Sequence, residues 1–102
     1  MIEYHKLVRD RIPEIIRGNG ETPLVEILDA DRFRRCLEQK LDEEVGEFHE
    51  SGDPEELADI LEVIYALGGL AGCSQDELEE IRRRKREERG GFDQRIFLIG
   101  KE

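Results

Sequence analysis

The feature that most constrains this chain is a pair of acidic steps, each set within a helical pattern of apolar residues. Glu44 and Glu47 stand three residues apart in the first pattern, and Glu56 and Asp59 do the same in the second. Around both steps, apolar residues recur at spacings of three and four, which is typical of an amphipathic helix. The chain is therefore expected to form two adjacent helices that each carry two carboxylates.

The acids fall where apolar side chains should be. At about 100° per residue, Glu44 and Glu56 lie inside the apolar stripes of their helices, whereas Glu47 and Asp59 lie at the stripe edges. The first stripe comprises Phe33, Leu37, Leu41, Val45 and Phe48, and the second Leu57, Ile60, Ile64, Leu67 and Ala71. Because an unpaired interior charge is costly, some cation should compensate these acids. Lys40 shares the face, but one lysine cannot balance four carboxylates.

A bound divalent cation is one explanation of this acidic pattern. Mg²⁺, or alternatively Mn²⁺, prefers oxygen ligands, and the four acids would supply them. A purely structural interpretation is also open, because the run from Asp53 to Glu56 fits an N-cap, a proline at N1 and a capping-box glutamate. The local charge favours the metal: eleven acids and one base lie between Glu38 and Glu62, an arrangement that repels itself without a cation.

The remaining segments predict an all-α helical bundle that forms one domain, 1–102. Helices are expected at about 31–50 and 54–70, and a capping box at Ser74 opens another that ends near Arg89. Pro13 suits the first turn of a short helix. Segments 25–28 and 95–99 have strand character, and would add a small two-stranded β element if they paired.

Length and composition exclude several classes of function. With 102 residues the core is small, so self-association would help to complete it. No apolar run approaches the ~18 residues of a membrane span, which predicts a cytoplasmic protein without a membrane partner. Cys36 and Cys73 stand apart, which argues against zinc and disulfides. A net charge of −10 argues against a nucleic-acid polymer as partner. A small polyphosphate is compatible with this charge if a bound metal ion and local bases make the electrostatic potential at the site positive.

Two motifs carry a resemblance to a known superfamily. The segment Lys40-Leu-Asp-Glu-Glu-Val-Gly-Glu47, followed by Glu56-Leu-Ala-Asp59, resembles the core signature of the all-α nucleotide pyrophosphohydrolases. This superfamily includes MazG-like enzymes, dimeric dUTPases and the phosphoribosyl-ATP pyrophosphohydrolase of histidine biosynthesis. The flanking segments 6–16 and 85–98 resemble a small subfamily often labelled phosphoribosyl-ATP pyrophosphohydrolase-like. Nearly the whole chain is covered by the resemblance.

The resemblance implies a Mg²⁺-dependent enzyme that hydrolyses a nucleoside triphosphate between its α and β phosphates. The products would be a nucleoside monophosphate and pyrophosphate, and the role would be to remove non-canonical or surplus nucleotides. Glu44, Glu47, Glu56 and Asp59 match the metal ligands, and Glu43 or Glu44 would be the catalytic base. Candidate phosphate-binding residues are Lys6, Arg9, Lys40, Lys85 and Arg89. A homodimer or homotetramer built on four-helix bundles is also implied.

Two alternative functions stay open. Phosphoribosyl-ATP hydrolysis belongs to the same chemical class, but the histidine-pathway enzyme tends to carry an aromatic-His pair where this chain has Glu62-Val63. The other alternative is a non-catalytic helical module that senses nucleotides or binds a partner. Turnover separates this alternative from the enzymes, because a sensor would bind nucleotide and metal without releasing pyrophosphate.

Overall fold

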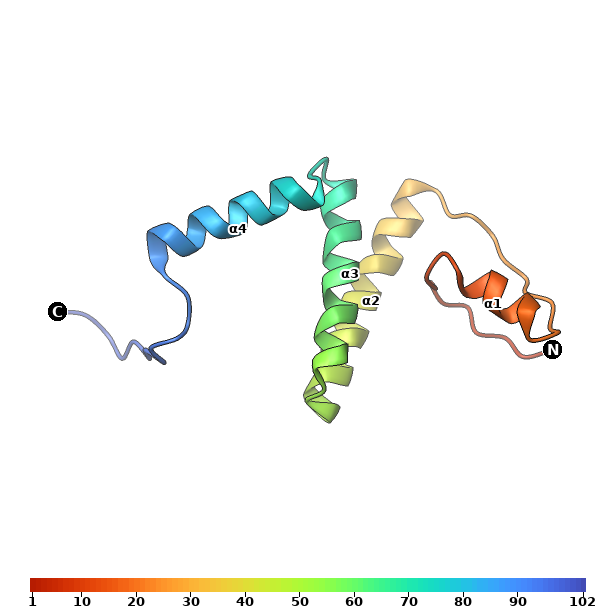
Figure 1. Cartoon of the computed structure of the whole chain (residues 1–102), viewed down its shortest axis with the longest axis horizontal. Helices are drawn as coiled ribbons and strands as arrows, with labels where there is room; N and C mark the ends of the chain where they lie inside the picture. The colour runs from red at the N-terminus through yellow and green to blue at the C-terminus, as the bar shows by residue number, and fades with distance from the viewer.

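Four helices follow one another along the chain, as Figure 1 shows in the computed structural model, which describes residues 1–102. Their bounds are Ile12–Gly18 for α1, Ala30–Ser51 for α2, Pro54–Leu70 for α3 and Gln75–Arg89 for α4. No strand is present. The all-α prediction is confirmed, and the predicted bounds of α2 and α3 are correct to within one residue.

Local capping signals set the helix starts. Asp29 and Asp53 each accept a hydrogen bond from a backbone N–H of the following turn, at 2.8 and 3.0 Å. At the start of α4, Ser74 and Glu77 form the reciprocal capping box that the sequence predicts. Such caps satisfy backbone donors that have no partner within the helix. The helix ends are therefore determined by short-range chemistry.

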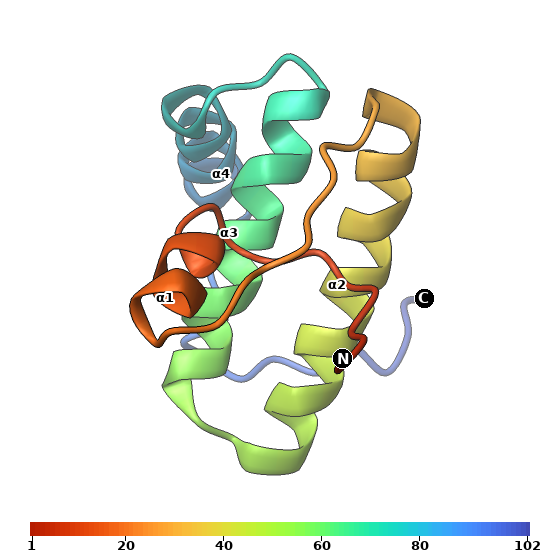
Figure 2. The ribbon, with the colours of Figure 1, turned by 90° about the vertical axis from the view of Figure 1, so that its right-hand side faces the viewer.

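The centre of the molecule is an antiparallel hairpin of α2 and α3, which pack against each other along their length (Figures 1 and 2). Gly52 ends α2 with a left-handed φ of 66°, which glycine adopts without a steric penalty. The buried residues of the chain are Leu37, Val63 and Glu44, and all three lie on this hairpin. A core this small leaves much apolar surface open to solvent.

The other elements extend away from the hairpin on opposite sides. α4 leaves α3 with a bend of 106°, while α1 and the N-terminal segment lie on the far side of the hairpin (Figure 1). The molecule measures 63 × 32 × 23 Å, with a radius of gyration of 18.0 Å. A compact chain of this length would have a radius near 13 Å. The single chain is therefore open rather than globular.

Two expectations from the sequence are wrong. Segments 25–28 and 95–99 form no β element, because they lie at opposite ends of the long axis with the hairpin between them (Figure 1). The apolar stripe of α3 is also displaced from the predicted one. Val63 is buried at 7 % exposure, whereas Leu57 is 46 % exposed. The displaced stripe continues through Glu56 and Asp59 at helical spacing, so it brings both acids toward the contact with α2.

Candidate metal centre

Three carboxylates from two helices converge on the hairpin. One oxygen each of Glu44, Glu56 and Asp59 lies within 4.8 Å of the other two. Glu44 comes from α2, and the other two acids lie one turn apart on α3, where a spacing of three residues places side chains on one face. We call these three residues the acidic cluster. The structure thus brings together three of the four predicted metal ligands.

Two oxygens of the acidic cluster are buried without a hydrogen-bond partner. Glu44 is only 6 % exposed, and its Oε2 atom and the Oε2 atom of Glu56 contact no donor. A buried carboxylate oxygen normally receives a hydrogen bond or coordinates a metal, because leaving it unpaired costs free energy. All three groups are oxygen donors, so the cluster fits a hard divalent cation.

The structural interpretation of Glu56 is contradicted. As a capping-box residue, Glu56 would accept a hydrogen bond from the backbone N–H of Asp53. That N–H instead donates to the Ser51 hydroxyl at 3.1 Å, and the Asp53 side chain accepts from Glu55. The start of α3 is therefore capped without Glu56, whose carboxylate is left to face the cluster.

Burial and mutual repulsion raise the proton affinity of the cluster. Burial raises the pKa of the Glu44 carboxyl, and the charges of Glu47 and Asp59 raise it further against the opposing effect of Lys40. Burial also raises the pKa of Glu56, with Glu47 adding to the effect through its charge and a side-chain hydrogen bond. A group of acids that holds protons more tightly than usual will also gain from binding a cation.

The fourth predicted ligand and the alternative base lie at the margin of the cluster. Glu47 is exposed and stays outside the trio, although its charge raises the pKa of both Glu44 and Glu56. Glu43 is also exposed, and it faces a separate cavity beside α2. The geometry alone distinguishes the three converging acids from these two.

Two cations of the chain contact the acidic cluster. Arg9 donates to an Asp59 oxygen at 2.6 Å, and the Lys40 Nζ atom lies 3.4 Å from Glu44 Oε1. Arg9 belongs to the N-terminal segment, which crosses the hairpin in Figure 2. Because both bases contact other oxygens, neither one satisfies the buried Oε2 atoms. The chain therefore compensates its acids only in part.

A cavity of about 140 Å³ lies beside α2, and Lys40 both lines it and contacts Glu44 of the cluster. Lys6 and Lys40 both line it, together with Gln39, Glu43 and His5. His5 has a left-handed φ of 47°, an unusual conformation for a residue with a side chain. No sequence pattern indicates a role for His5 or Gln39, because only the path of the N-terminal segment over α2 brings them together.

The remaining predicted phosphate partners lie elsewhere in the chain. Lys85 and Arg89 belong to α4, which contacts α3 but not α2. α4 points away from the hairpin from its first turn onward (Figure 1). Within one chain, therefore, Arg9 and Lys40 contact the acidic cluster, Lys6 shares a cavity with Lys40, and the two bases of α4 do neither.

Comparison with known proteins yields one partial match that we describe here. The chain is 55 % identical over 42 residues to an uncharacterized protein of Mycolicibacterium smegmatis (strain ATCC 700084 / mc(2)155). The match spans 41 % of this chain and 43 % of that protein, so less than half of the relative is covered. No family model matches the sequence. No solved structure matches either.

No single helix is both long enough and apolar enough to cross a membrane, although α3 and α4 would qualify if the bend between them were ignored.

Proposed function

We propose that this chain is a cytoplasmic, Mg²⁺-dependent pyrophosphohydrolase of nucleoside triphosphates. It would cleave between the α and β phosphates to release a nucleoside monophosphate and pyrophosphate, and so remove non-canonical or surplus nucleotides. The observation that supports this best is the pair of buried, unpartnered Oε2 atoms of Glu44 and Glu56 beside Asp59. The resemblance of the two acidic steps to the all-α nucleotide pyrophosphohydrolases supplies the reaction.

The donor set supports Mg²⁺, with Mn²⁺ as the alternative. Glu44, Glu56 and Asp59 would hold the ion, and Glu47 is near enough to complete the site after a side-chain rotation. Mg²⁺ usually takes only a few protein carboxylates and keeps positions for water and substrate phosphates. When bound, the ion would neutralise phosphate oxygens and lower the pKa of a coordinated water.

The neighbouring bases would hold the polyphosphate. The net charge of the chain is −10, so a triphosphate is repelled at long range and needs local cations at the site. Lys6 and Lys40 line the adjoining cavity, where their ammonium groups would pair with phosphate oxygens. Arg9 offers a planar donor pair for the same oxygens. These three bases are the phosphate-binding residues of the proposal.

Either of two carboxylates would accept the proton of the attacking water. The raised pKa of Glu44 makes it a stronger base than an ordinary glutamate. Glu43 is exposed at the cavity, where it would receive the proton without giving up a role as ligand. In both cases the water oxygen becomes bonded to phosphorus, while the bridging oxygen leaves with the departing phosphate group.

A panel of nucleotides tests the proposal. Purified chain would be incubated with Mg²⁺ and with canonical and modified triphosphates or phosphoribosyl-ATP, while pyrophosphate and monophosphate products are measured. We expect both products in equal amounts, and none when EDTA is added. Preference for phosphoribosyl-ATP would favour the histidine-pathway alternative. Binding of nucleotide and metal without any pyrophosphate release would contradict the hydrolase and favour a sensing module.

A further inference from the structure

The last thirteen residues form an extended arm that nothing in its own chain covers. This C-terminal arm, residues 90–102, carries four consecutive apolar residues, Ile96 to Ile99, which are 78 to 95 % exposed. Phe92 is 97 % exposed. Because the four apolar residues are consecutive, no side of this run is polar. An exposed apolar segment of this kind is typical of a site that packs against another protein surface.

Gly90, Gly91 and an ion pair form the junction between α4 and the arm. Gly90 has a left-handed φ of 84°, and the Arg86 side chain lies directly over Gly91, where an added Cβ would come within 2.0 Å of its Nη1 atom. Arg86 also pairs with Asp93 at 3.1 Å. The positive φ of Gly90 favours glycine where the arm leaves α4, and the exposed pair of Arg86 with Asp93 links the first residues of the arm to the helix. The arm is therefore free to contact a surface outside its own chain.

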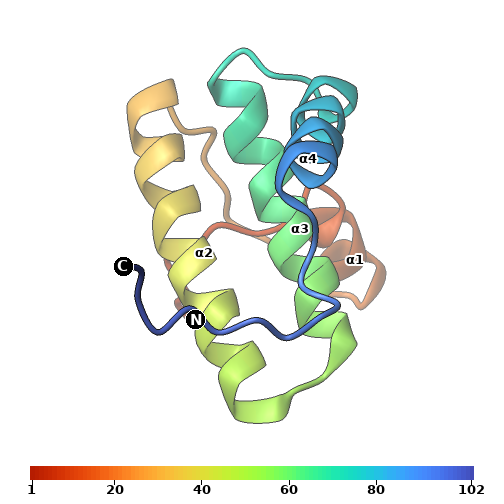
Figure 3. The ribbon, with the colours of Figure 1, turned by 90° about the vertical axis from the view of Figure 1, so that its left-hand side faces the viewer.

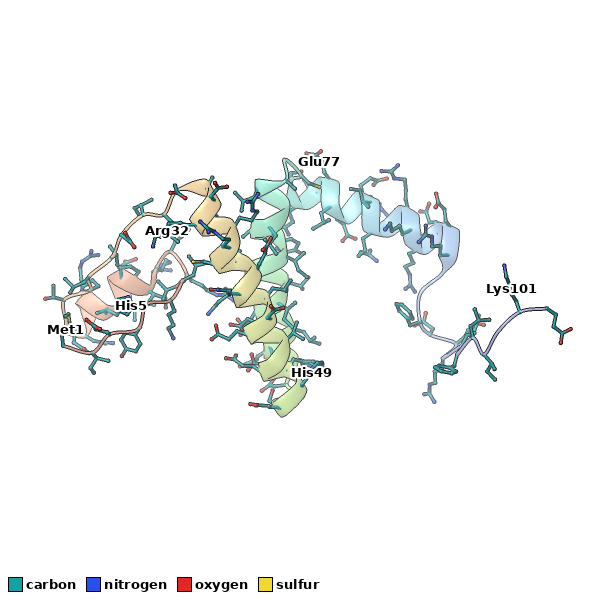
Figure 4. All side chains as sticks on the ribbon, turned by 180° about the vertical axis from the view of Figure 1, so that it is seen from behind. Met1, His5, Arg32, His49, Glu77 and Lys101 are labelled. Carbon is teal, nitrogen blue, oxygen red and sulfur yellow. The ribbon has the colours of Figure 1, made fainter.

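The C-terminal half of α4 and the hairpin carry opposite charges that do not meet within one chain. From Arg82 to Arg89 there are six bases and two acids, a net charge of +4, and the arm itself is neutral with two bases and two acids. From Glu38 to Glu62 there are eleven acids and one base, a net charge of −10. In Figure 3 the arm appears to cross the hairpin, but Figure 1 shows that the two lie far apart along the long axis. Figure 4 likewise places Lys101 at the far end of the molecule from His49 at the hairpin tip.

The exposed area requires a large partner surface. The single chain exposes 9347 Å², whereas a compact monomer of 11.9 kDa exposes about 6,000 Å². The excess, about 3,300 Å² per chain, is larger than the ~800 Å² that one partner of a standard interface buries, and larger than the ~1,000–2,500 Å² per partner of typical obligate homodimers. A second copy of this chain would supply both the complementary charge and the missing area.

We infer that the C-terminal arm of one copy docks on the α2–α3 hairpin of a second copy, and that the exchange is reciprocal. The basic residues that precede and flank the arm meet the acids of the hairpin. The apolar run covers residues that the hairpin leaves open, including Leu57 and Leu61, which are 46 and 47 % exposed. A cavity of about 270 Å³ between α3 and α4, lined by Leu61, Ile64, Tyr65 and Leu78, offers space for an aromatic side chain of the arm. A two-fold axis would generate both contacts at once.

The interface is tested by the mass of the assembly in solution, which does not depend on nucleotide hydrolysis. Light scattering over a dilution series should give at least twice the chain mass of 11.9 kDa for the unmodified protein. A chain truncated after Gly91 should be monomeric with unchanged helicity by circular dichroism. A full-length variant with Arg84→Glu, Lys85→Glu and Arg89→Glu should dissociate in the same way, and none of these three bases is in an ion pair that the variant would break.

A matched variant controls for the change of net charge. Arg17→Glu, Arg34→Glu and Arg35→Glu alter the same number of exposed bases outside α4 and the arm, with the loss of one exposed pair between Arg34 and Asp31, and should leave the assembly intact. Added NaCl should shift the unmodified protein toward monomer, because the pairing of opposite charges is screened. The inference is overturned if the unmodified chain is monomeric at tens of micromolar, or if the truncated and charge-reversed variants assemble as it does.

Discussion

The Arg9 guanidinium lies 2.6 Å from a carboxylate oxygen of Asp59, and this contact ties the N-terminal segment to the acidic cluster. The two residues are fifty positions apart, so the pair depends on how α1 and the hairpin are arranged. Asp59 is at once the partner of a cation of its own chain and a candidate ligand for an external one. The two roles compete, and the competition can be measured.

Replacement of Arg9 by Gln should tighten Mg²⁺ binding. The substitution removes a positive charge that repels the ion and frees the Asp59 oxygen to coordinate it. Stability without metal should fall by at most about 1 kcal/mol, because the pair is about half exposed and such pairs contribute little. Calorimetric titration with Mg²⁺ measures the affinity. Arg11→Gln is the control, since Arg11 pairs with exposed Glu14 away from the cluster. Equal or weaker binding by Arg9→Gln would show that the ion does not use Asp59.

Mg²⁺ or Mn²⁺ should raise the melting temperature of the protein. A ligand that binds only the folded state stabilises it by mass action, by about 2.7 kcal/mol at a concentration of ~100 times Kd. Glu56→Gln should lose most of this effect, because it removes the charge from one of the converging oxygens. Glu62→Gln makes the same change at an exposed position on the same helix, and should respond to the metal as the unmodified chain does. Melting curves that both ions leave unchanged would argue against the metal centre.

The metal-free protein should lose stability as the pH rises from mildly acidic to neutral. The folded-state pKa values of Glu44 and Glu56 are raised, so the folded state binds more protons than the unfolded state above the ordinary glutamate pKa of about 4.3. Stability therefore falls with pH across the window between the unfolded and folded values. Chemical denaturation at several pH values in EDTA measures this slope.

Saturating Mg²⁺ should weaken or abolish that pH dependence, because the ion takes the place of the protons bound at the cluster. Glu56→Gln should also reduce the slope, since the variant has one fewer group to titrate. If the free energy of unfolding of the metal-free protein rises over the same pH window, the carboxylates do not repel one another in the folded state. It would also remove one reason to expect a cation at the cluster.

The sequence predicts the hairpin and its acids well because these depend on short-range signals. The caps at Asp53 and Ser74 define helix starts from a few neighbouring residues, and the helical period places Glu44 inside, as its 6 % exposure confirms. The contact between the acids of α2 and those of α3 follows from a turn too short to permit any other arrangement. This part of the candidate site could therefore be predicted before the fold was known.

The rest could not be predicted because it depends on long-range arrangement. Nothing in the spacing of Arg9 or His5 indicates that the N-terminal segment crosses the hairpin to reach Asp59 or the cavity. The stripe of α3 was also misplaced, since Leu57 and Val63 are both apolar and only the packing of α2 decides which one is buried. The direction of α4 depends on the bend of 106° after Leu70, which no local signal in the sequence predicts. The apolar run at 95–99 predicts a strand, but the structure leaves this run exposed and unpaired, because no other segment of the chain comes near it.

Substitutions that keep the size of each acid should separate the roles of the carboxylates in turnover. Glu44→Gln and Glu56→Gln should each lower kcat/KM on the best nucleotide of the panel by on the order of 100-fold or more, as expected for groups that hold the metal. Glu62→Gln should stay within a factor of about two of the unmodified chain, because its exposed side chain lies outside the acidic cluster. Circular dichroism and the assembly mass of each variant distinguish a lost site from a lost fold. If Glu62→Gln is as damaging as Glu56→Gln while both remain folded, then the converging face of the hairpin is not where the reaction occurs.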